Sequence, residues 1–529
     1  MPKNKKPNIL HIFVDQMRHD TIAALGNPVI KTPNLDRLAQ SGISFTNAYT
    51  PSPVCIAARC SMIYGQYPMH TGTYENRAMP QDGRETFMDG LKDNGYHTYG
   101  IGKCHFSPNS EALLGFEERE RQEELTRLDL DKEPYLQLLK DKGYDYVCEP
   151  HGIRGEMYYV PQPSQLPESL HPTTWIRERT QAFLERKKDS DKPWYLFSSF
   201  IHPHPPFAPP NPWHKIYRGA LMPLPNVPAN VDSLQTYVNK CQNRYKYKDQ
   251  GLDNNLLRTM KAYYYACISF IDYQVGLILD TLESTGQLDN TLIIFTSDHG
   301  EHLGDYNCFG KRSFHDTAAR IPMLVSMPGK FEGGVTCDTP VSLIDLAPTF
   351  LNLGNANIKS HELDGEDLYD IFTGASKRDT VFGQLSYFNP RNSIVEDNDK
   401  VSPILRENEE LWRASASTYM AVSKDWKYFY SAPDEQEYLF NKKTDPFETR
   451  NSAGLVFNKQ NLLTMRHKTM DFLRNGNETA GVEGDQWKLF GKKIIPDDPD
   501  TGLLIQDTKM PWVKNEVKNY SEHNLDRMF

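Results

Sequence analysis

The sequence lacks paired cysteines, a long hydrophobic run and a long basic tract. Its eight cysteines show no regular spacing and no Cys-x-x-Cys pair, which fits a reducing compartment, or an oxidising one without a disulfide framework. No run approaches the roughly 18 apolar residues that a membrane-spanning helix needs. The net charge of -10 also argues against nucleic-acid binding as the main task. We therefore expect no nucleic-acid partner and no membrane span.

The N-terminus carries no recognisable targeting segment. It reads Met-Pro-Lys-Asn-Lys-Lys-Pro-Asn and then enters an apolar stretch, 9–14, that is too short for the core of a signal peptide. A cytoplasmic protein is therefore expected, or a periplasmic one if a signal peptide has been removed.

The length of 529 residues is too great for one ordinary core. Two domains, or one large domain with an appendage, are expected, and a hydrophobic fraction of 38% suffices to build them. Neither an internal repeat nor a low-complexity tract is present.

Strands alternate with helices in the first part of the chain. Strands are expected at 8–14, 96–101, 193–200 and 290–296, and helices at 34–42, 86–94, 256–282 and 343–353. This alternation predicts an α/β domain over 1–375, with a mostly parallel central sheet flanked by helices. Ligands of such sheets gather at the carboxyl ends of the strands. Asp15 and Asp298 both follow predicted strands, which supports a shared site.

The second part of the chain has a different pattern. A polar, turn-rich stretch at 358–377 precedes four short apolar runs at 381–385, 418–422, 426–430 and 438–441, followed by a helix at 455–473. We therefore predict a smaller α+β subdomain with an antiparallel sheet over 376–529, ending in a polar surface tail.

Two segments carry groups that could bind one divalent cation. Asp15 and Gln16 end the first strand, and Asp298 and His299 end a later one. Oxygen ligands favour Ca²⁺, Mg²⁺ or Mn²⁺ over zinc. Taken alone, each segment could equally be a strand end followed by a turn.

Cys55 stands at the start of a predicted helix over 57–64. The positive end of the helix dipole would lower the pKa of its thiol. The alternative is a buried structural cysteine, which is the commoner fate of a free thiol. Arg59 lies one turn further on, on the same face of the helix.

Five motifs follow one another in an order that resembles the sulfatase family. They are Cys55-Ile-Ala-Ala-Arg59, Gly102-Lys-Cys-His105, Pro203-His-Pro205, Ser297-Asp-His-Gly300 and Gly310-Lys311. The resemblance covers roughly residues 7 to 452 and implies an alkaline-phosphatase-like α/β fold.

The resemblance implies that a maturation enzyme oxidises Cys55 to formylglycine, whose hydrated aldehyde is the nucleophile. It also implies one metal ion, with Ca²⁺ expected and Mg²⁺ or Mn²⁺ as alternatives. The implied ligands are Asp15, Gln16, Asp298, His299 and the oxygen derived from Cys55. Gln16 departs from the family, since many members carry Asp there, and should weaken or shift cation binding. Ala57 also replaces the more usual Pro.

The resemblance further implies a two-step displacement. One diol hydroxyl attacks sulfur while His204, aided by Lys311, protonates the leaving alcohol. His105 then removes the proton of the second hydroxyl, so that sulfate leaves. Lys103 and Arg59 complete the catalytic set and offset negative charge. Four residues are expected near the substrate: Asn76, Arg77, His202 and His315.

The leading interpretation is hydrolysis of a sulfate ester, with a sulfated saccharide as substrate because saccharides are common in the family. Asp-Gln together with Asp-His is also the pattern of phosphonate monoester and phosphodiester hydrolases, which form the first alternative. The second is a catalytically silent protein that binds metal but is never matured. A hydrolase that uses the Cys55 thiol directly would not need the metal ligands.

Overall fold

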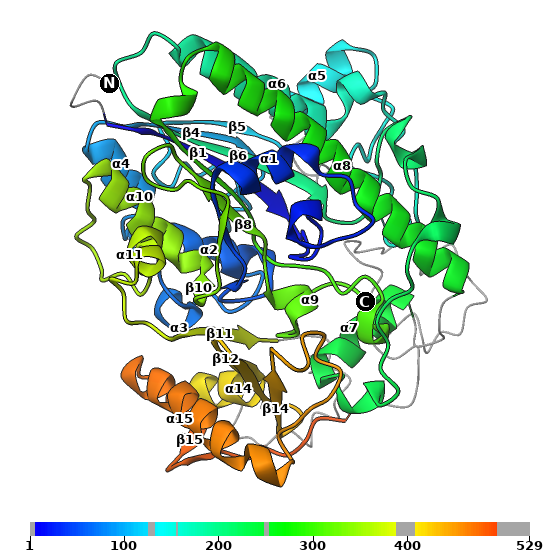
Figure 1. The fold of residues 1–529 in the computed structure, drawn as a ribbon, viewed down its shortest axis with the longest axis vertical. Coiled ribbons are helices and arrows are strands. Elements are labelled where there is room, and N and C mark those ends of the chain that lie inside the picture. The colour runs from blue at the N-terminus through cyan, green and yellow to red at the C-terminus, as the bar shows by residue number, and fades with distance from the viewer. Residues whose placement is uncertain (1–5, 125–132, 155–156, 248–252, 388–407, 495–529) are drawn as a thin grey trace.

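The computed structural model of the chain describes residues 6–124, 133–154, 157–247, 253–387 and 408–494 (Figure 1). A large α/β part is joined to a smaller C-terminal part, which lies below it in Figure 1. The predicted tail beyond residue 494 lies outside the described residues.

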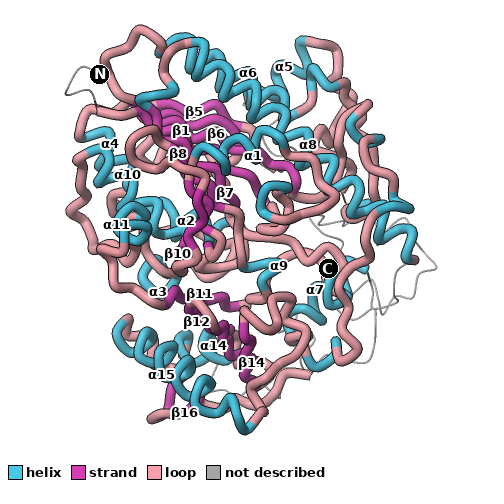
Figure 2. The backbone as a smooth tube through the Cα atoms, viewed as in Figure 1, coloured by secondary structure: helices cyan, strands magenta, loops and turns pink. Residues whose placement is uncertain are grey.

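An eight-stranded sheet forms the centre of the large part, in the order β5-β4-β6-β1-β7-β8-β2-β9 (Figure 2). The strands from β5 to β7 are parallel, whereas β8 pairs antiparallel with β7 and with β2. The prediction of a mostly parallel sheet is therefore confirmed. The strands are β1 Asn8–Asp15, β2 Ile43–Phe45, β4 His97–Gly102, β5 Glu118–Arg121, β6 Trp194–Pro203, β7 Thr291–Ser297, β8 Met323–Ser326 and β9 Val335–Cys337.

Both faces of the sheet are covered, which explains why every residue of β1 is buried. Leu10 and Ile12 belong to the core that includes α1, α6 and α8, whereas Ile9 and Phe13 belong to the core of α2, α4, α10 and α11. The helices are α1 Pro33–Ser41, α2 Cys55–Tyr64, α4 Phe87–Asp93, α6 Pro172–Lys187, α8 Asn254–Ser284, α10 Leu346–Gly354 and α11 Leu368–Thr373.

Shorter elements connect these layers. β3 and β10 form a two-stranded parallel pair. The bounds are α3 Pro68–Thr71, α5 Pro134–Asp141, α7 Tyr237–Tyr247, α9 Asp316–Ala319, β3 Ala48–Tyr49 and β10 Val341–Ser342.

The C-terminal part contains the predicted antiparallel sheet, in the order β11-β12-β13-β14. Tyr419 and Tyr430 stack on Trp487 of the small β15–β16 hairpin, with ring centroids 5.5 and 4.2 Å apart. The bounds are β11 Thr380–Ser386, β12 Ser417–Ser423, β13 Trp426–Ser431, β14 Gln436–Asn441, α14 Glu409–Ser415, α15 Lys459–Asn475, β15 Val482–Glu483 and β16 Gln486–Trp487.

The opposite face of the C-terminal sheet packs on the large part. Met420 and Phe429 share one buried cluster with Val54 and Ala57, which flank and begin α2. The C-terminal sheet therefore supports the helix that carries Cys55. The predicted division at residue 375 stays a prediction.

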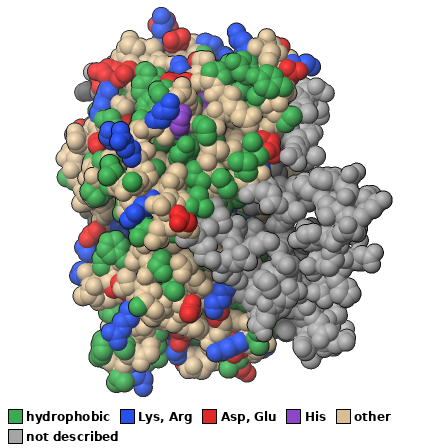
Figure 3. Space-filling view, turned by 90° about the vertical axis from the view of Figure 1, so that its right-hand side faces the viewer, with side chains coloured by type: hydrophobic (Ala, Val, Ile, Leu, Met, Phe, Trp, Pro, Cys, Tyr) green, Lys and Arg blue, Asp and Glu red, His purple; other side chains and the backbone are tan. Residues whose placement is uncertain are grey.

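Charges on the surface are dispersed. In the face drawn in Figure 3, lysine and arginine side chains lie scattered among acidic, hydrophobic and uncharged ones. Across the described ranges, no helix has both the length and the apolar character to cross a bilayer.

Candidate active site

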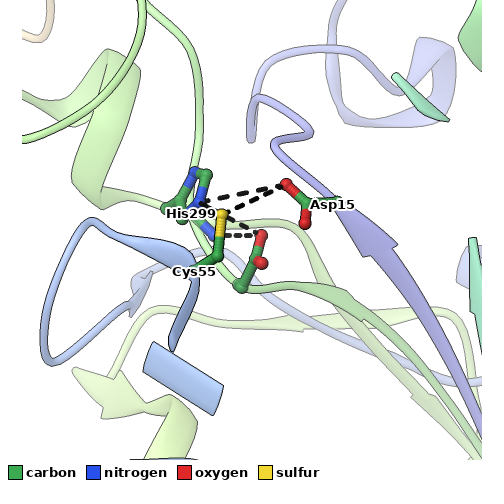
Figure 4. A group of neighbouring side chains, drawn as sticks. Asp15, Cys55 and His299 are labelled. Carbon is green, nitrogen blue, oxygen red and sulfur yellow. Dashed lines mark hydrogen bonds and ion pairs between the residues drawn. The ribbon is translucent and has the colours of Figure 1, made fainter. Parts of the chain in front are cut away.

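The site forms where the neighbouring parallel strands β1 and β7 end (Figure 4). Asp15 is the last residue of β1, and Asp298 directly follows β7. Cys55 is the first residue of α2, which ends at Gly65 with a φ of 64°. A side chain at Gly65 would be strained, and its Cβ would lie 2.7 Å from a methyl group of Leu363. The closing turn of α2 is thus fixed by packing.

Four buried side chains converge at this edge. One ligand atom from each of Asp15, Cys55, Asp298 and His299 lies within 4.8 Å of all the others. The Cys55 sulfur is 3.8 Å from Oδ1 of Asp15 and 3.3 Å from Nε2 of His299. The Nδ1 atom of His299 lies 3.0 Å from the Gly300 carbonyl and donates to it, which leaves Nε2 free to face the group.

Arg59 is fully buried beneath this group. Its Nε is 3.0 Å from Oδ2 of Asp298, and its Nη2 is 3.2 Å from Oδ2 of Asp15. Its Nη1 donates to the Lys103 carbonyl at 2.6 Å and to Ser199 Oγ at 3.2 Å. Arg59 therefore holds both carboxylates in place and offsets part of their charge.

The pKa values of the two carboxylates shift in opposite directions. Burial and the Cys55 thiolate would raise the pKa of Asp15, but the charge of Lys103 and other cations holds it well below its ordinary range. Burial and the negative charge of Asp15 raise the pKa of Asp298. A cation among the converging ligand atoms would relieve this repulsion, so the donor set fits a divalent ion.

Lys311 lies directly against the nucleophile candidate. Its Nζ is 2.7 Å from the Cys55 sulfur and 2.9 Å from Oε1 of Gln16. Burial alone would raise the pKa of the Cys55 thiol, but the charges of Lys311 and Lys103 outweigh burial and hold it well below its ordinary value. These charges therefore favour the thiolate form of unmodified Cys55.

Lys103 and His204 meet at Glu124. The Lys103 Nζ is 2.6 Å from Oδ2 of Asp15 and 2.5 Å from Oε2 of Glu124. Oε1 of Glu124 is 2.6 Å from Arg154 and 3.4 Å from Nε2 of His204. Burial lowers the pKa of His204, and the Glu124 carboxylate opposes that shift.

His105 and His204 are the two remaining predicted catalytic residues near Cys55. His105 has a φ of 57°, and its backbone N–H donates to the Glu123 carboxylate at 3.2 Å. The His105 side chain contributes to the lowered pKa of the Cys55 thiol, and Cys55 in turn acts to raise the pKa of His204. The structure thus brings together all six predicted catalytic residues and all five predicted metal ligands.

Asn76 lies beside the start of α2, next to Cys55. Its Oδ1 accepts from the backbone N–H of Ile56 at 2.9 Å, which satisfies a free donor in the first turn of α2. The neighbouring Arg77 pairs with Glu75 at 2.5 Å, and its side chain is 52% exposed.

His202 and His315 contact residues outside this group. Nε2 of His202 is 3.3 Å from the His151 carbonyl, and its ring centroid lies 5.0 Å from that of His171. His315 packs among aromatic rings at the C-terminal sheet, 4.6 Å from the ring of Tyr306. Neither contact supports a role in substrate binding, which stays a prediction.

The sequence interpretation overlooked two carboxylates of this site, the partly buried Glu124 and the buried Glu301. Glu301 directly follows the Ser-Asp-His-Gly motif and touches Gln16, so its position next to a predicted ligand was an available signal. Glu124 follows the short charged strand β5, Glu-Arg-Glu-Arg, which gives no comparable signal.

Comparison with known proteins shows the family of this chain. The sequence model of the family described as Sulfatase matches residues 7–356. An arylsulfatase of Clostridium perfringens is 32% identical over 458 residues, which cover 82% of this chain and 91% of that protein.

Solved structures share the fold. The phosphonate monoester hydrolase of Agrobacterium radiobacter superposes with a TM-score of 0.75 at 24% identity, covering 90% of this chain and 98% of that one. A protein solved with its substrate D-glucosamine-2-N,6-O-disulfate gives a TM-score of 0.68 at 19% identity, covering 90% of this chain and all of that one. The chain belongs to the sulfatase family of the alkaline phosphatase superfamily and is a sulfuric ester hydrolase.

Proposed function

We propose that the protein hydrolyses the sulfate ester of a saccharide, using a nucleophile made by oxidation of Cys55 to formylglycine and one bound divalent cation. The observation that carries this proposal is the position of Cys55. Its sulfur lies among the ligand atoms of Asp15, Asp298 and His299 and 2.7 Å from the Lys311 ammonium. A maturation enzyme is the partner that the proposal requires.

When formed and hydrated, formylglycine supplies a hydroxyl nucleophile with a second hydroxyl on the same carbon. Lys103 and Lys311 provide fixed positive charge for the sulfate oxygens. His204 directs Nε2 to the site because its Nδ1 donates to the Pro205 carbonyl at 2.7 Å. Glu124 favours a proton on that Nε2, which suits His204 to protonate the leaving alcohol. His105 takes the proton of the second hydroxyl.

The cation would be held by Asp15, Gln16, Asp298 and His299 together with an oxygen derived from Cys55. Four of these five groups offer oxygen, which favours Ca²⁺, with Mg²⁺ and Mn²⁺ as alternatives. Bound there, the cation supplies Lewis acidity and charge neutralisation. The saccharide part of the proposal rests on the sulfated saccharide bound by one structural neighbour.

Hydrolysis of phosphonate monoesters is the second candidate. The neutral Gln16 next to His299 favours it, since one anionic ligand fewer changes the charge presented to the reaction centre. The two candidates differ in the atom attacked, not in the nucleophile.

The test compares 4-nitrophenyl sulfate with the 4-nitrophenyl ester of phenylphosphonate, because the leaving group is then the same. The chain is produced together with a maturation enzyme. We expect kcat/KM to be at least tenfold higher for the sulfate, and turnover to vanish in Cys55→Ala. Cys267→Ala is the matched control, since Cys267 is buried in α8 away from the site and should keep its activity. A faster phosphonate reaction would establish the second candidate, and an active Cys55→Ala protein would exclude both.

A further inference from the structure

We propose that Glu301 is a positioning residue that fixes the orientation of the Gln16 side-chain amide, so that its oxygen faces the cation site. The inference rests on the cation of the proposed function. It explains how this chain uses Gln at a position where an amide could present either oxygen or nitrogen.

The contacts of the amide allow one orientation. Oε1 of Gln16 is 2.9 Å from the Lys311 ammonium, while Nε2 donates to Oε2 of Glu301. An ammonium group only donates hydrogen bonds, and a carboxylate that receives donors on every side only accepts them. Turning the amide over would place NH₂ against an ammonium group and oxygen against a carboxylate, so both contacts would become repulsive.

Glu301 is itself immobilised. Its Oε1 accepts from the backbone N–H groups of Leu303 and Gly310 at 2.9 and 2.5 Å. Its Oε2 accepts from the hydroxyl of Tyr159 at 2.9 Å as well as from Gln16. The side chain is fully buried. Four donors therefore surround the carboxylate, which leaves it no alternative position and no role as a donor.

The backbone of Gln16 is tied to the same site. Its N–H donates to Oδ1 of Asp298 at 3.0 Å, and its carbonyl accepts from Tyr264 at 2.8 Å. Its φ of 65° turns the chain sharply after β1. With the backbone of the residue held, its side-chain torsions remain, and the contact with Glu301 fixes the terminal amide. Partners of this kind, behind a metal ligand, typically change metal affinity about 10- to 100-fold when mutated.

The first experiment measures Ca²⁺ binding by isothermal titration calorimetry on matured protein. Glu301→Gln can both donate and accept, so the Gln16 amide loses its fixed orientation and affinity should fall about 10- to 100-fold. Glu124→Gln is the matched control, because it also removes one negative charge near the site, while the contacts of Glu124 are with Lys103 and Arg154 and not with Gln16. Equal losses in the two variants would show a general charge effect and overturn the inference.

The second experiment measures unfolding by urea with EDTA present, so it needs no cation. Glu301→Gln should lower the midpoint in the natural chain, where it loosens the contact with Gln16. In a Gln16→Glu background, two carboxylates face each other, and adding Glu301→Gln should raise the midpoint because an amide can donate to a carboxylate. A lower midpoint in both backgrounds would mean that Glu301 is merely structural and would overturn the inference. If the natural chain binds no Ca²⁺, the proposal of a bound Ca²⁺ is wrong. The opposite effects of Glu301→Gln in the two backgrounds still test the contact between Glu301 and Gln16.

Discussion

Replacing Arg59 with Met should make the fold depend on a bound cation. Arg59 is buried and pairs with Asp15 at 3.2 Å and with Asp298 at 3.0 Å. Removing one partner of a buried ion pair costs about 3–5 kcal/mol, because the other charge stays buried and unpaired. Asp298 loses its arginine partner and Asp15 keeps only Lys103, so we expect a loss within this range, about 4 kcal/mol without a cation.

A cation should restore most of that loss. An ion at 100 times its Kd stabilises a folded protein by about 2.7 kcal/mol, and at 1,000 times its Kd by about 4.1 kcal/mol. Loss of the Arg59 charge strengthens the attraction between the carboxylates and the ion. Suppose that Arg59→Met binds Ca²⁺ ten times more tightly than the natural protein. A Ca²⁺ concentration that stabilises the natural protein by about 2.7 kcal/mol then stabilises Arg59→Met by about 4.1 kcal/mol.

The assay is urea unfolding of both proteins in EDTA and in Ca²⁺. Arg378→Met is the control: Arg378 pairs with the buried Asp345 at 2.5 Å, and the pair is separate from the group of converging ligand atoms. Arg378→Met should also be less stable than the natural protein. Adding Ca²⁺ should raise the free energy of unfolding of Arg378→Met by no more than it raises that of the natural protein. The reasoning is refuted if Ca²⁺ stabilises Arg59→Met no more than the natural protein.

Two further predictions concern stability. Burial lowers the pKa of His202 to about 4 and that of His315 to about 3, against 6.5 for an ordinary histidine. As pH falls, each of these histidines therefore binds a proton in the unfolded chain before it does so in the folded protein. Between pH 6.5 and the folded pKa, each histidine should lower the free energy of unfolding by about 1.4 kcal/mol per pH unit. His315→Gln should reduce the slope of unfolding free energy against pH by one proton, and an unchanged slope would contradict this. Lys427→Met should lower the free energy of unfolding, measured in urea, by about 3–5 kcal/mol, because the buried Lys427 lies 2.6 Å from Asp316 and 2.7 Å from Glu448. A loss below about 1 kcal/mol would show that these carboxylates find other partners.

The elements that position the site were predictable because their signals are local. Strand β1 is apolar on both faces and stops at Asp15, and β7 stops just before Asp298. Parallel strands place their carboxyl ends at one edge, so the meeting of these carboxylates followed from the pattern. The direction of β8, with only four residues, carries no local signal, and its antiparallel pairing appears only in the structure.

The contacts of individual side chains could not be predicted from the sequence. His202 and His315 stand close in sequence to His204 and Lys311, yet in the structure they pack against other aromatic rings, His171 and Tyr306. Glu124 reaches the site through contacts with Lys103 and Arg154 that are distant in sequence. Such contacts depend on the packing of segments that join only when the chain has folded.

Mass spectrometry of the peptide that contains Cys55 tests the central claim most directly. The chain should be produced with an active maturation enzyme and digested under conditions that preserve aldehydes. The account predicts an aldehyde at position 55 that reacts with a hydrazide probe. A peptide that carries only the free thiol, alongside a sulfatase that the same cells do convert, would contradict it.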